Sequence, residues 1–257
     1  MAPEGEAPAA IHAERRGAGA SLVLVHGFTQ TGRSWEPIAA DLAIDHQVVV
    51  VDAPGHGGSG AVRAGLSDGA RALAAAAGPG TYIGYSMGAR YVLRAALADP
   101  DTVRAAVLLG VNPGIEDAGE RATRRASDEA LAQQLERDGV DHFLDGWLSQ
   151  PLFAGLPHSA ADLADRRRNT AAGLASSLRR AGTGAEPDVW DAVGRLAMPV
   201  LVLAGSEDAK FAAIGERLAA AIGANAHFEL VPGAGHAAHL EQPEAFVAIV
   251  RAWLVRR

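Results

Sequence analysis

Cysteine is absent from this chain of 257 residues, and lysine occurs once, at Lys210. Without cysteine the chain has no disulfide framework, no thiolate metal site and no cysteine nucleophile. Aromatic residues are scarce, and no apolar run approaches the roughly 18 residues that a membrane helix needs. The beginning of the chain also lacks the apolar segment typical of a signal peptide. The sequence therefore predicts a cytoplasmic protein without membrane insertion.

The charge balance is acidic, with a formal net charge of -7, which argues against nucleic acid as a partner. A hydrophobic fraction of 49% and the length of the chain predict a folded protein with a substantial core. Every basic residue except Lys210 is arginine. That bias is typical of a GC-rich genome, but arginine is also the better residue for gripping carboxylates in a fixed geometry. The oligomeric state is left open.

Short apolar runs rich in β-branched residues indicate strands buried on both faces of a parallel sheet. The clear runs are Ser21–Val25, Gln47–Val51, Arg104–Leu109 and Pro199–Leu203, and the weaker ones are Thr81–Ile83 and His227–Val231. Ala-rich helical stretches alternate with them, at Trp35–Leu42, Gly69–Ala77, Met87–Ala98, Ile214–Ile222 and Pro243–Val255. This alternation predicts an α/β fold with a doubly wound, mostly parallel sheet.

The alternation stops between residues 112 and 197, where the chain is polar, rich in arginine and helical in pattern. We interpret this segment as a helical lid inserted at the carboxyl ends of the strands, where it would cover the ligand crevice. Residues 20–111 and 198–257 then form the core. Residues 1–19 form an N-terminal extension, partly flexible, with room for one strand at Ile11–Arg16.

The strongest motif is Gly84-Tyr85-Ser86-Met87-Gly88, a G-x-S-x-G pattern between an expected strand and an expected helix. In this context the turn is so sharp that the residues two before and two after the serine must be small. It presents Ser86 Oγ above the sheet at a helix N-terminus. The alternative is a glycine-rich turn in which Ser86 only caps the helix.

A serine nucleophile needs a base and an orienting acid, which in this fold follow it in the order Asp or Glu, then His. Asp208 follows the strand Pro199–Leu203, and His236 follows the strand His227–Val231. Both lie at the carboxyl end of a strand, so we predict the triad Ser86, Asp208 and His236. Glu207 is the rival acid and His239 the rival base.

The loop after the first clear strand reads His26-Gly27-Phe28. A second oxyanion donor is expected in this loop, so the backbone N–H groups of Phe28 and Met87 are predicted to hold a developing oxyanion. The segment Asp52–Ser59 fits a tight turn that shapes the site without reacting.

Taken together, these segments resemble the α/β-hydrolase superfamily from about Ser21 to Arg257. The lid narrows the resemblance, because Trp147 to Phe153 reads W-x-x-Q-P-x-F and residues 205–211 read GSEDAKF. These strings, with the arginines at 166–168 and the pair Arg124 and Asp128, are similar to the 2-succinyl-6-hydroxy-2,4-cyclohexadiene-1-carboxylate synthases of menaquinone biosynthesis.

The resemblance implies a lyase that needs no metal or cofactor and eliminates pyruvate from a small substrate bearing several carboxylates. It implies that the Ser86 alkoxide acts as a base rather than as a nucleophile. By the same resemblance, Tyr85, Trp147 and Phe153 line the pocket, Arg124 is a lid contact, and one of the three arginines at 166–168 meets the substrate, with Arg168 favoured. Arg90 lies one helical turn after Ser86 on a similar face, and arginine is the suitable fork for a carboxylate.

Each of these assignments has an alternative in which the residue has only a structural role or the protein has another function. Arg90 and Arg124 could be solvated helix charges, and the aromatic residues could belong to the core of the lid. A serine esterase or carbon–carbon bond hydrolase would use the same triad. A hydrolase fold kept for ligand binding without turnover is a third reading.

Overall fold

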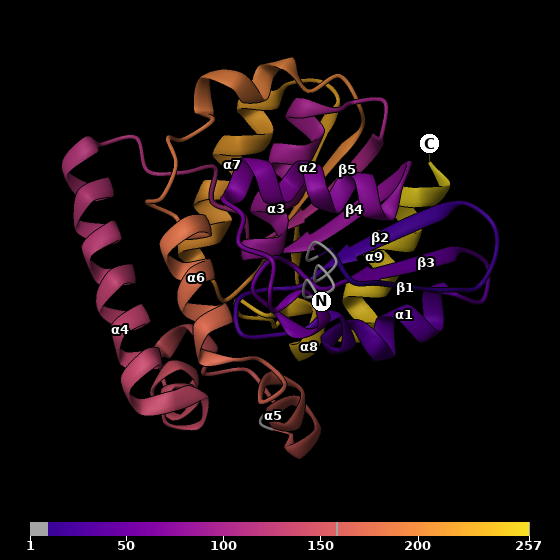
Figure 1. Cartoon of the computed structure of the whole chain (residues 1–257). Coiled ribbons are helices and arrows are strands. Elements are labelled where there is room, and N and C mark those ends of the chain that lie inside the picture. The colour runs from indigo at the N-terminus through magenta and orange to yellow at the C-terminus, as the bar shows by residue number, and fades with distance from the viewer. Residues whose placement is uncertain (1–9, 158, 257) are drawn as a thin grey trace, which may run out of the picture.

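The computed structural model describes residues 10–157 and 159–256, and its centre is a seven-stranded sheet (Figure 1). The strands are β1 Ala13–Arg16, β2 Ser21–Val25, β3 Gln47–Val51, β4 Gly80–Tyr85, β5 Val103–Leu109, β6 Val200–Gly205 and β7 Ala226–Val231. Their order in the sheet is β1-β3-β2-β4-β5-β6-β7. Strand β1 pairs antiparallel with β3, and the other neighbours pair in parallel. The predicted α/β fold with a mostly parallel, doubly wound sheet is confirmed.

Helices cover both faces of the sheet, because the strands are apolar on both sides. The helices of the core are α1 Glu36–Leu42, α2 Leu66–Ala77, α3 Met87–Ala98, α7 Ala209–Ile222, α8 Ala238–Glu241 and α9 Pro243–Val255. One buried apolar cluster joins the sheet to α2, α3 and α7. A second cluster joins its other face to α1 and α9.

The predicted elements agree closely with the structure where apolar residues continue to the end of the element. Strands β2 and β3 and helices α3 and α9 have the expected bounds. Strand β4 is longer than the expected Thr81–Ile83, because Gly80 at its start and Gly84 near its end interrupt the apolar pattern in the sequence. Helix α7 begins at Ala209 rather than at Ile214, because the Asp208 side chain caps it.

The predicted N-terminal extension, 1–19, lies partly outside the described residues, since 1–9 are not described. Within it, Ala13–Arg16 forms the edge strand β1 against β3, inside the early strand that the sequence allowed at Ile11–Arg16.

Between β5 and β6 the described chain is helical. Its elements are α4 Ala118–Leu148, α5 Ala160–Arg166, α6 Ala171–Ala181 and the short 3-10 helices η3 Pro151–Phe153 and η4 Trp190–Arg195. The division into core and lid stays an interpretation. Helix α4 bends at Gly139, whose φ of 82° interrupts the helical backbone. Helices α4 and α6 run side by side over a small apolar cluster of their own (Figure 1).

Polar contacts attach the lid to the core loops. The Asp165 carboxylate accepts hydrogen bonds from the Thr31 hydroxyl at 2.6 Å and from the Thr31 amide at 3.2 Å. Asn169 accepts from the Gly57 amide at 2.9 Å and donates to the Thr29 carbonyl at 2.7 Å. All of these lid atoms meet the loops that follow β2 and β3, so the lid base is held directly beside the strand ends.

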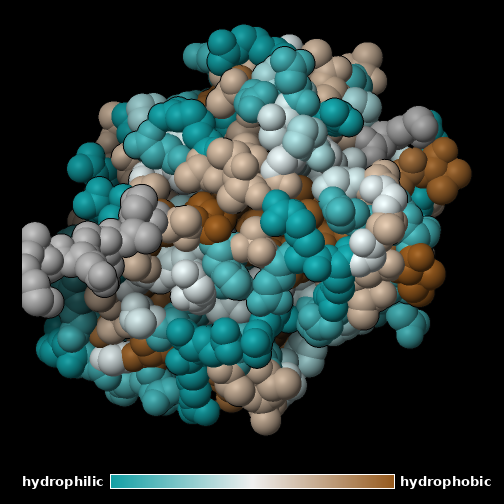
Figure 2. Space-filling model, turned by 45° about the vertical axis from the view of Figure 1, so that its right-hand side comes forward, coloured by the Kyte–Doolittle hydropathy of each residue, from teal (hydrophilic) through white to brown (hydrophobic). Residues whose placement is uncertain are grey.

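The surface alternates polar and apolar residues. In Figure 2 hydrophilic side chains cover much of the visible face, and strongly hydrophobic residues stand out as separate spots. Among the described residues, no helix combines the length and the apolar character needed to cross a membrane.

Candidate active site

Ser86 lies in a strained turn between β4 and α3. Its backbone has φ 51° and ψ -108°, which is rare for a residue with a side chain. A Cβ on Gly84 would lie 2.6 Å from the Ala89 backbone, and one on Gly88 would lie 2.1 Å from the Val25 carbonyl. These contacts explain why the turn needs glycine at both positions. The resulting geometry lifts Ser86 Oγ out of the sheet at the beginning of α3.

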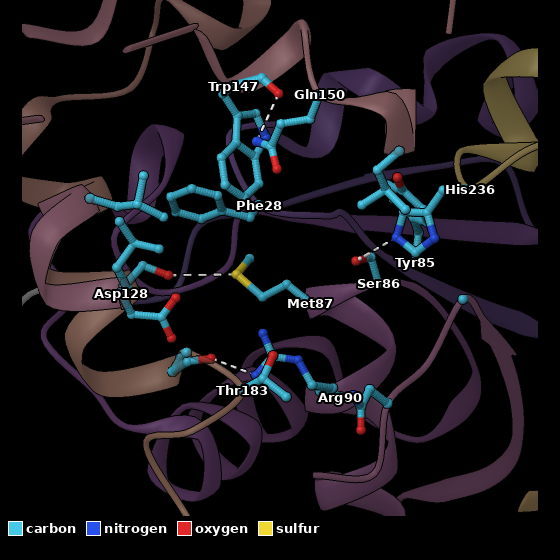
Figure 3. A pocket seen from close by; sticks show the side chains of 18 of the residues that line it. Phe28, Tyr85, Ser86, Met87, Arg90, Asp128, Trp147, Gln150, Thr183 and His236 are labelled. Atoms are coloured by element: carbon cyan, nitrogen blue, oxygen red, sulfur yellow. Dashed lines mark hydrogen bonds between the residues drawn. The ribbon is translucent and has the colours of Figure 1, made fainter. Parts of the chain in front are cut away.

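His236 connects Ser86 to Asp208. Its Nε2 lies 3.1 Å from Ser86 Oγ (Figure 3), and its Nδ1 lies 2.8 Å from Asp208 Oδ2. The other carboxylate oxygen of Asp208 accepts from the Phe211 amide at 3.2 Å, which fixes the rotamer of the acid. The side chains of His236 and Asp208 are buried, with 2% and 8% exposure. The arrangement has the geometry of an activated serine.

The two rival residues lie elsewhere. Glu207 is exposed, and no hydrogen bond joins its side chain to His236 among the described residues. His239 is fully buried between the rings of Trp35 and Tyr85, both with centroids at 4.4 Å. Burial lowers the pKa of His239 to about 3, so it is neutral at physiological pH. Its environment is that of a core residue.

Phe28 and Met87 both line the cavity beside Ser86, as an oxyanion site requires. Met87 is the first residue of α3, so its amide has no intrahelical acceptor. The loop of Phe28 is fixed by His26, whose Nε2 accepts from the Ala53 amide at 3.0 Å and whose Nδ1 donates to the Gly27 carbonyl at 2.8 Å. Burial lowers the pKa of His26 and keeps it in the neutral form that these bonds need.

A cavity of about 410 Å³ opens above Ser86, between the strand ends and the lid. Its walls include Phe28, Tyr85, Ser86, Met87, Arg90, Arg124, Trp147, Phe153 and His236, all singled out from the sequence. The structure thus brings nine of the candidate residues to one cavity, while Asp208 stands behind His236.

The cavity is cationic although the chain is acidic. Among the described residues, Arg90, Arg124, Arg166 and Lys210 line it, and the one carboxylate in its walls is Asp128. Asp128 accepts from Arg124 Nε at 2.9 Å. Burial raises the pKa of Asp128. Between residues 112 and 190 acidic residues outnumber arginines. The cavity is therefore positive because a few cationic side chains point into it, and not because this segment is basic in composition.

Arg90 is an arginine of the cavity that has no carboxylate partner among the described residues. Its Nη1 donates to the Ala181 carbonyl at 2.7 Å, and no ion pair involves it in the described part of the chain (Figure 3). Burial, and to a lesser degree the positive charge of Arg124, lower its pKa to about 10. The guanidinium is still protonated at neutral pH, and an anion bound in the cavity would stabilise its positive charge.

Arg166, and not Arg168, is the arginine of its triplet that reaches the cavity. Arg166 is buried, donates from Nε to Asp162 Oδ2 at 2.7 Å and donates from Nη1 to the Thr29 hydroxyl. Arg168 follows the end of α5, is largely exposed and lies 3.8 Å from an Asp165 oxygen. The sequence favoured Arg168 as the substrate contact, and that role stays a prediction, but the cavity wall holds Arg166 instead, because consecutive helix positions point about 100° apart. The sequence offered one signal for Arg166, because Asp162 stands one helical turn earlier and can pair with it.

Aromatic rings close the upper side of the cavity. Trp147 stacks on Phe143 with centroids 5.6 Å apart and meets Phe28 edge to face at 5.1 Å. Phe153 of η3 lies 6.4 Å from the His236 ring. Tyr85 lines the cavity next to His236, with ring centroids 5.3 Å apart, and burial raises the pKa of Tyr85. The predicted aromatic residues therefore serve both the lid core and the cavity wall.

Sequence reasoning missed part of the lining. Gln30 and Asn112 face the cavity, and the Gln30 Oε1 accepts from the Gly27 amide at 2.9 Å. Asn112 belongs to no motif with a chemical requirement, so no sequence signal singled it out. Gln30 stands in the loop after β2, where the sequence indicates only that it could alter the mouth of the pocket.

The fold and the serine site define an α/β hydrolase, and the sequence profile of the α/β hydrolase family matches residues 22–249. The chain belongs to this family and, within it, to the family of 2-succinyl-6-hydroxy-2,4-cyclohexadiene-1-carboxylate synthases. The synthase of Salmonella schwarzengrund is 33% identical, with 88% of this chain and 90% of that protein covered.

Two solved structures are similar over most of the chain. MenH from S. aureus has a TM-score of 0.90 at 27% identity, covering 95% of this chain and 98% of that one. A thermophilic esterase from Thermogutta terrifontis has a TM-score of 0.80 at 25% identity, covering 96% and 93%. The fold is therefore shared with MenH and with an esterase.

Proposed function

We propose that this protein is a cofactor-free lyase that eliminates pyruvate from the succinyl-enolpyruvyl cyclohexene carboxylate intermediate of menaquinone biosynthesis. Membership in the synthase family supports the reaction. The observation that carries it here is that one cavity holds both the Ser86–His236 pair and an arginine, Arg90, that lacks a carboxylate partner among the described residues. A substrate with several carboxylates fits such a cavity.

The reaction begins with transfer of the Ser86 proton to His236 Nε2. The Asp208 carboxylate stabilises the imidazolium that forms, because its oxygen accepts from Nδ1 at 2.8 Å. The alkoxide then removes a proton from the substrate ring, and those electrons move through the conjugated system. The carbon–oxygen bond to the enolpyruvyl group breaks, and the leaving enolate takes the proton from His236 and becomes pyruvate.

Charge that develops on the substrate is held by the cavity walls. The amides of Phe28 and Met87 receive an oxyanion near Ser86, and such a donor contributes about 3–4 kcal/mol to transition-state stabilisation. Arg90, with Arg124 from the lid, holds a carboxylate further in. Arg166 contributes positive charge from the base of the lid.

The second candidate is an ester or carbon–carbon bond hydrolase. The triad geometry serves that chemistry equally well, and the esterase of Thermogutta terrifontis has the same fold. A binding module without turnover is the weakest candidate, since it needs no hydrogen-bonded serine and histidine.

Pyruvate release from the proposed substrate tests the function. The wild-type chain releases pyruvate stoichiometrically with the ring product, and Ser86→Ala lowers kcat by about 10³-fold or more. Intact-mass measurement during turnover detects no covalent adduct on Ser86, because the alkoxide acts as a base. An accumulating acyl-enzyme with ester hydrolysis and no pyruvate would move the assignment to the hydrolase.

The remaining expectations stay predictions: a cytoplasmic location, no nucleic-acid partner and an oligomeric state that is still open.

A further inference from the structure

The loop that carries His236 is fastened by the side chain of Glu241. One Glu241 oxygen accepts from the Gly235 amide at 2.7 Å, and the other accepts from the Ala237 amide at 2.9 Å. These two amides belong to the residues directly before and after His236. Both oxygens of a single carboxylate therefore hold the backbone on either side of the histidine.

The lid also contacts the Glu241 carboxylate, through the loop after η3. Gly155, in the loop after η3, approaches so closely that a Cβ there would lie 2.2 Å from Glu241 Oε2. Two residues earlier, at the end of η3, Phe153 is buried with its ring 6.4 Å from that of His236. The lid loop thus meets both the histidine ring and the group that fixes its backbone.

We propose that Glu241 is a positioning residue for His236, and that seating of the lid loop at Gly155 is coupled to the histidine through its carboxylate. The ring must satisfy two bonds at once, with Ser86 and with Asp208, so a small rotation of the backbone at His236 breaks one of them. The inference rests on the proposed role of Ser86 and His236 as the reactive pair, and not on the identity of the substrate.

The arrangement requires a carboxylate in particular. Both partners of Glu241 are N–H donors, and an ionised carboxylate has acceptors only. A glutamine offers one acceptor and one NH₂ group, so in Glu241→Gln one amide faces another donor and loses its bond. The volume of the side chain is nearly unchanged, which separates the charge and bonding pattern from packing.

The test measures how fast a serine-reactive fluorophosphonate labels Ser86, together with kcat and KM for pyruvate release. In Glu241→Gln we expect the labelling rate constant and kcat to fall about tenfold with KM within about twofold, because the loss falls on proton transfer and not on binding. Glu241→Asp, which restores a carboxylate, recovers part of both rates. Glu244→Gln, an exposed acid three residues further on, is the matched control and keeps both rates.

Gly155→Ala tests the coupling from the lid side. The new methyl displaces Glu241 without lining the cavity, so labelling falls about threefold with the same sparing of KM. If Glu241 only stabilises the fold of the loop, Glu241→Gln will lower the unfolding temperature and leave the labelling rate per folded molecule unchanged. That result would overturn the proposal. Wild-type labelling in Gly155→Ala overturns the coupling. Labelling needs no natural substrate, so absence of pyruvate release in the wild type would contradict the proposed function and leave this test intact.

Discussion

The core and the lid place their functional side chains by different means. In the core, Ser86 is fixed by backbone contacts that admit no Cβ at Gly84 or Gly88. In the lid, Arg124 and Arg166 are long side chains held by carboxylates one turn away, at 2.9 Å and 2.7 Å. The reacting atom thus depends on the geometry of the sheet, whereas the cations depend on pairing. We therefore expect substitutions in the core to lower the rate of the chemical step sharply. Substitutions in the lid should lower substrate affinity by smaller amounts.

Outside the triad, the largest effect is expected from Gly88→Ala. Its methyl would meet backbone oxygens at 2.1 Å and 2.6 Å, and neither can move without shifting β2 or α3. We expect loss of about 1–3 kcal/mol of stability from overpacking, and a fall of at least about 100-fold in fluorophosphonate labelling of Ser86.

Gly146→Ala in the lid helix α4 is the matched control, because nothing lies within 4 Å of the new methyl. Alanine favours the helix, so stability rises by about 0.5–1 kcal/mol and labelling is unchanged. Equal effects of the two substitutions on labelling would break the contrast between core and lid.

Arg90→Ala is expected to raise KM more than Arg124→Ala does. Arg90 has no carboxylate partner among the described residues, while Arg124 is already paired with Asp128. Loss of a charge-assisted bond of about 2 kcal/mol corresponds to about 30-fold for Arg90, and we expect about fivefold for Arg124. Steady-state kinetics of pyruvate release measure both. A larger effect for Arg124 would show that the lid, and not the core helix α3, holds the substrate anion. Arg90→Lys should recover part of the loss, because it keeps the charge without the fork.

The same contrast explains what the sequence could predict. Strands β2 and β3 have the expected bounds because burial on both faces produces a continuous apolar run. Ser86, Asp208 and His236 stand next to strand ends, and the order of the strands brings them together.

The lid was harder to predict, since its side chains are chosen by tertiary contacts. The sequence favoured Arg168, but Arg166 faces the cavity, because the turn at the end of α5 decides the direction of each side chain. No pattern in the sequence indicated a role for Glu241. Its side chain folds back over its own short helix to reach Gly235, a contact that depends on how the His236 loop packs.

A last prediction concerns the stability of the core and not its chemistry, through two buried histidines. Burial lowers the pKa of His56 and of His239 from 6.5 to about 3. Below pH 6.5 the unfolded chain takes up protons at these positions while the folded chain does not, so the free energy of unfolding falls as pH falls toward 3. Each residue contributes about 1.4 kcal/mol per pH unit to this slope.

Urea unfolding between pH 7 and pH 4 measures it. His239→Phe should reduce the slope by the share of one histidine, because a phenyl ring between Trp35 and Tyr85 cannot titrate. His142→Gln, at an exposed position of the lid, should keep the wild-type slope. An unchanged slope in His239→Phe would contradict the account of a neutral buried core histidine.

We propose that a serine core shared with esterases performs elimination because of the cations around it. The measurement that decides this is the ratio of kcat/KM for pyruvate release to kcat/KM for hydrolysis of a neutral p-nitrophenyl ester, in the wild type and in Arg90→Ala. We expect a high ratio in the wild type that drops about 30-fold in the variant, with ester hydrolysis nearly unchanged. Efficient ester hydrolysis without pyruvate release, or a ratio that does not respond to Arg90, would show that the cations do not direct the reaction.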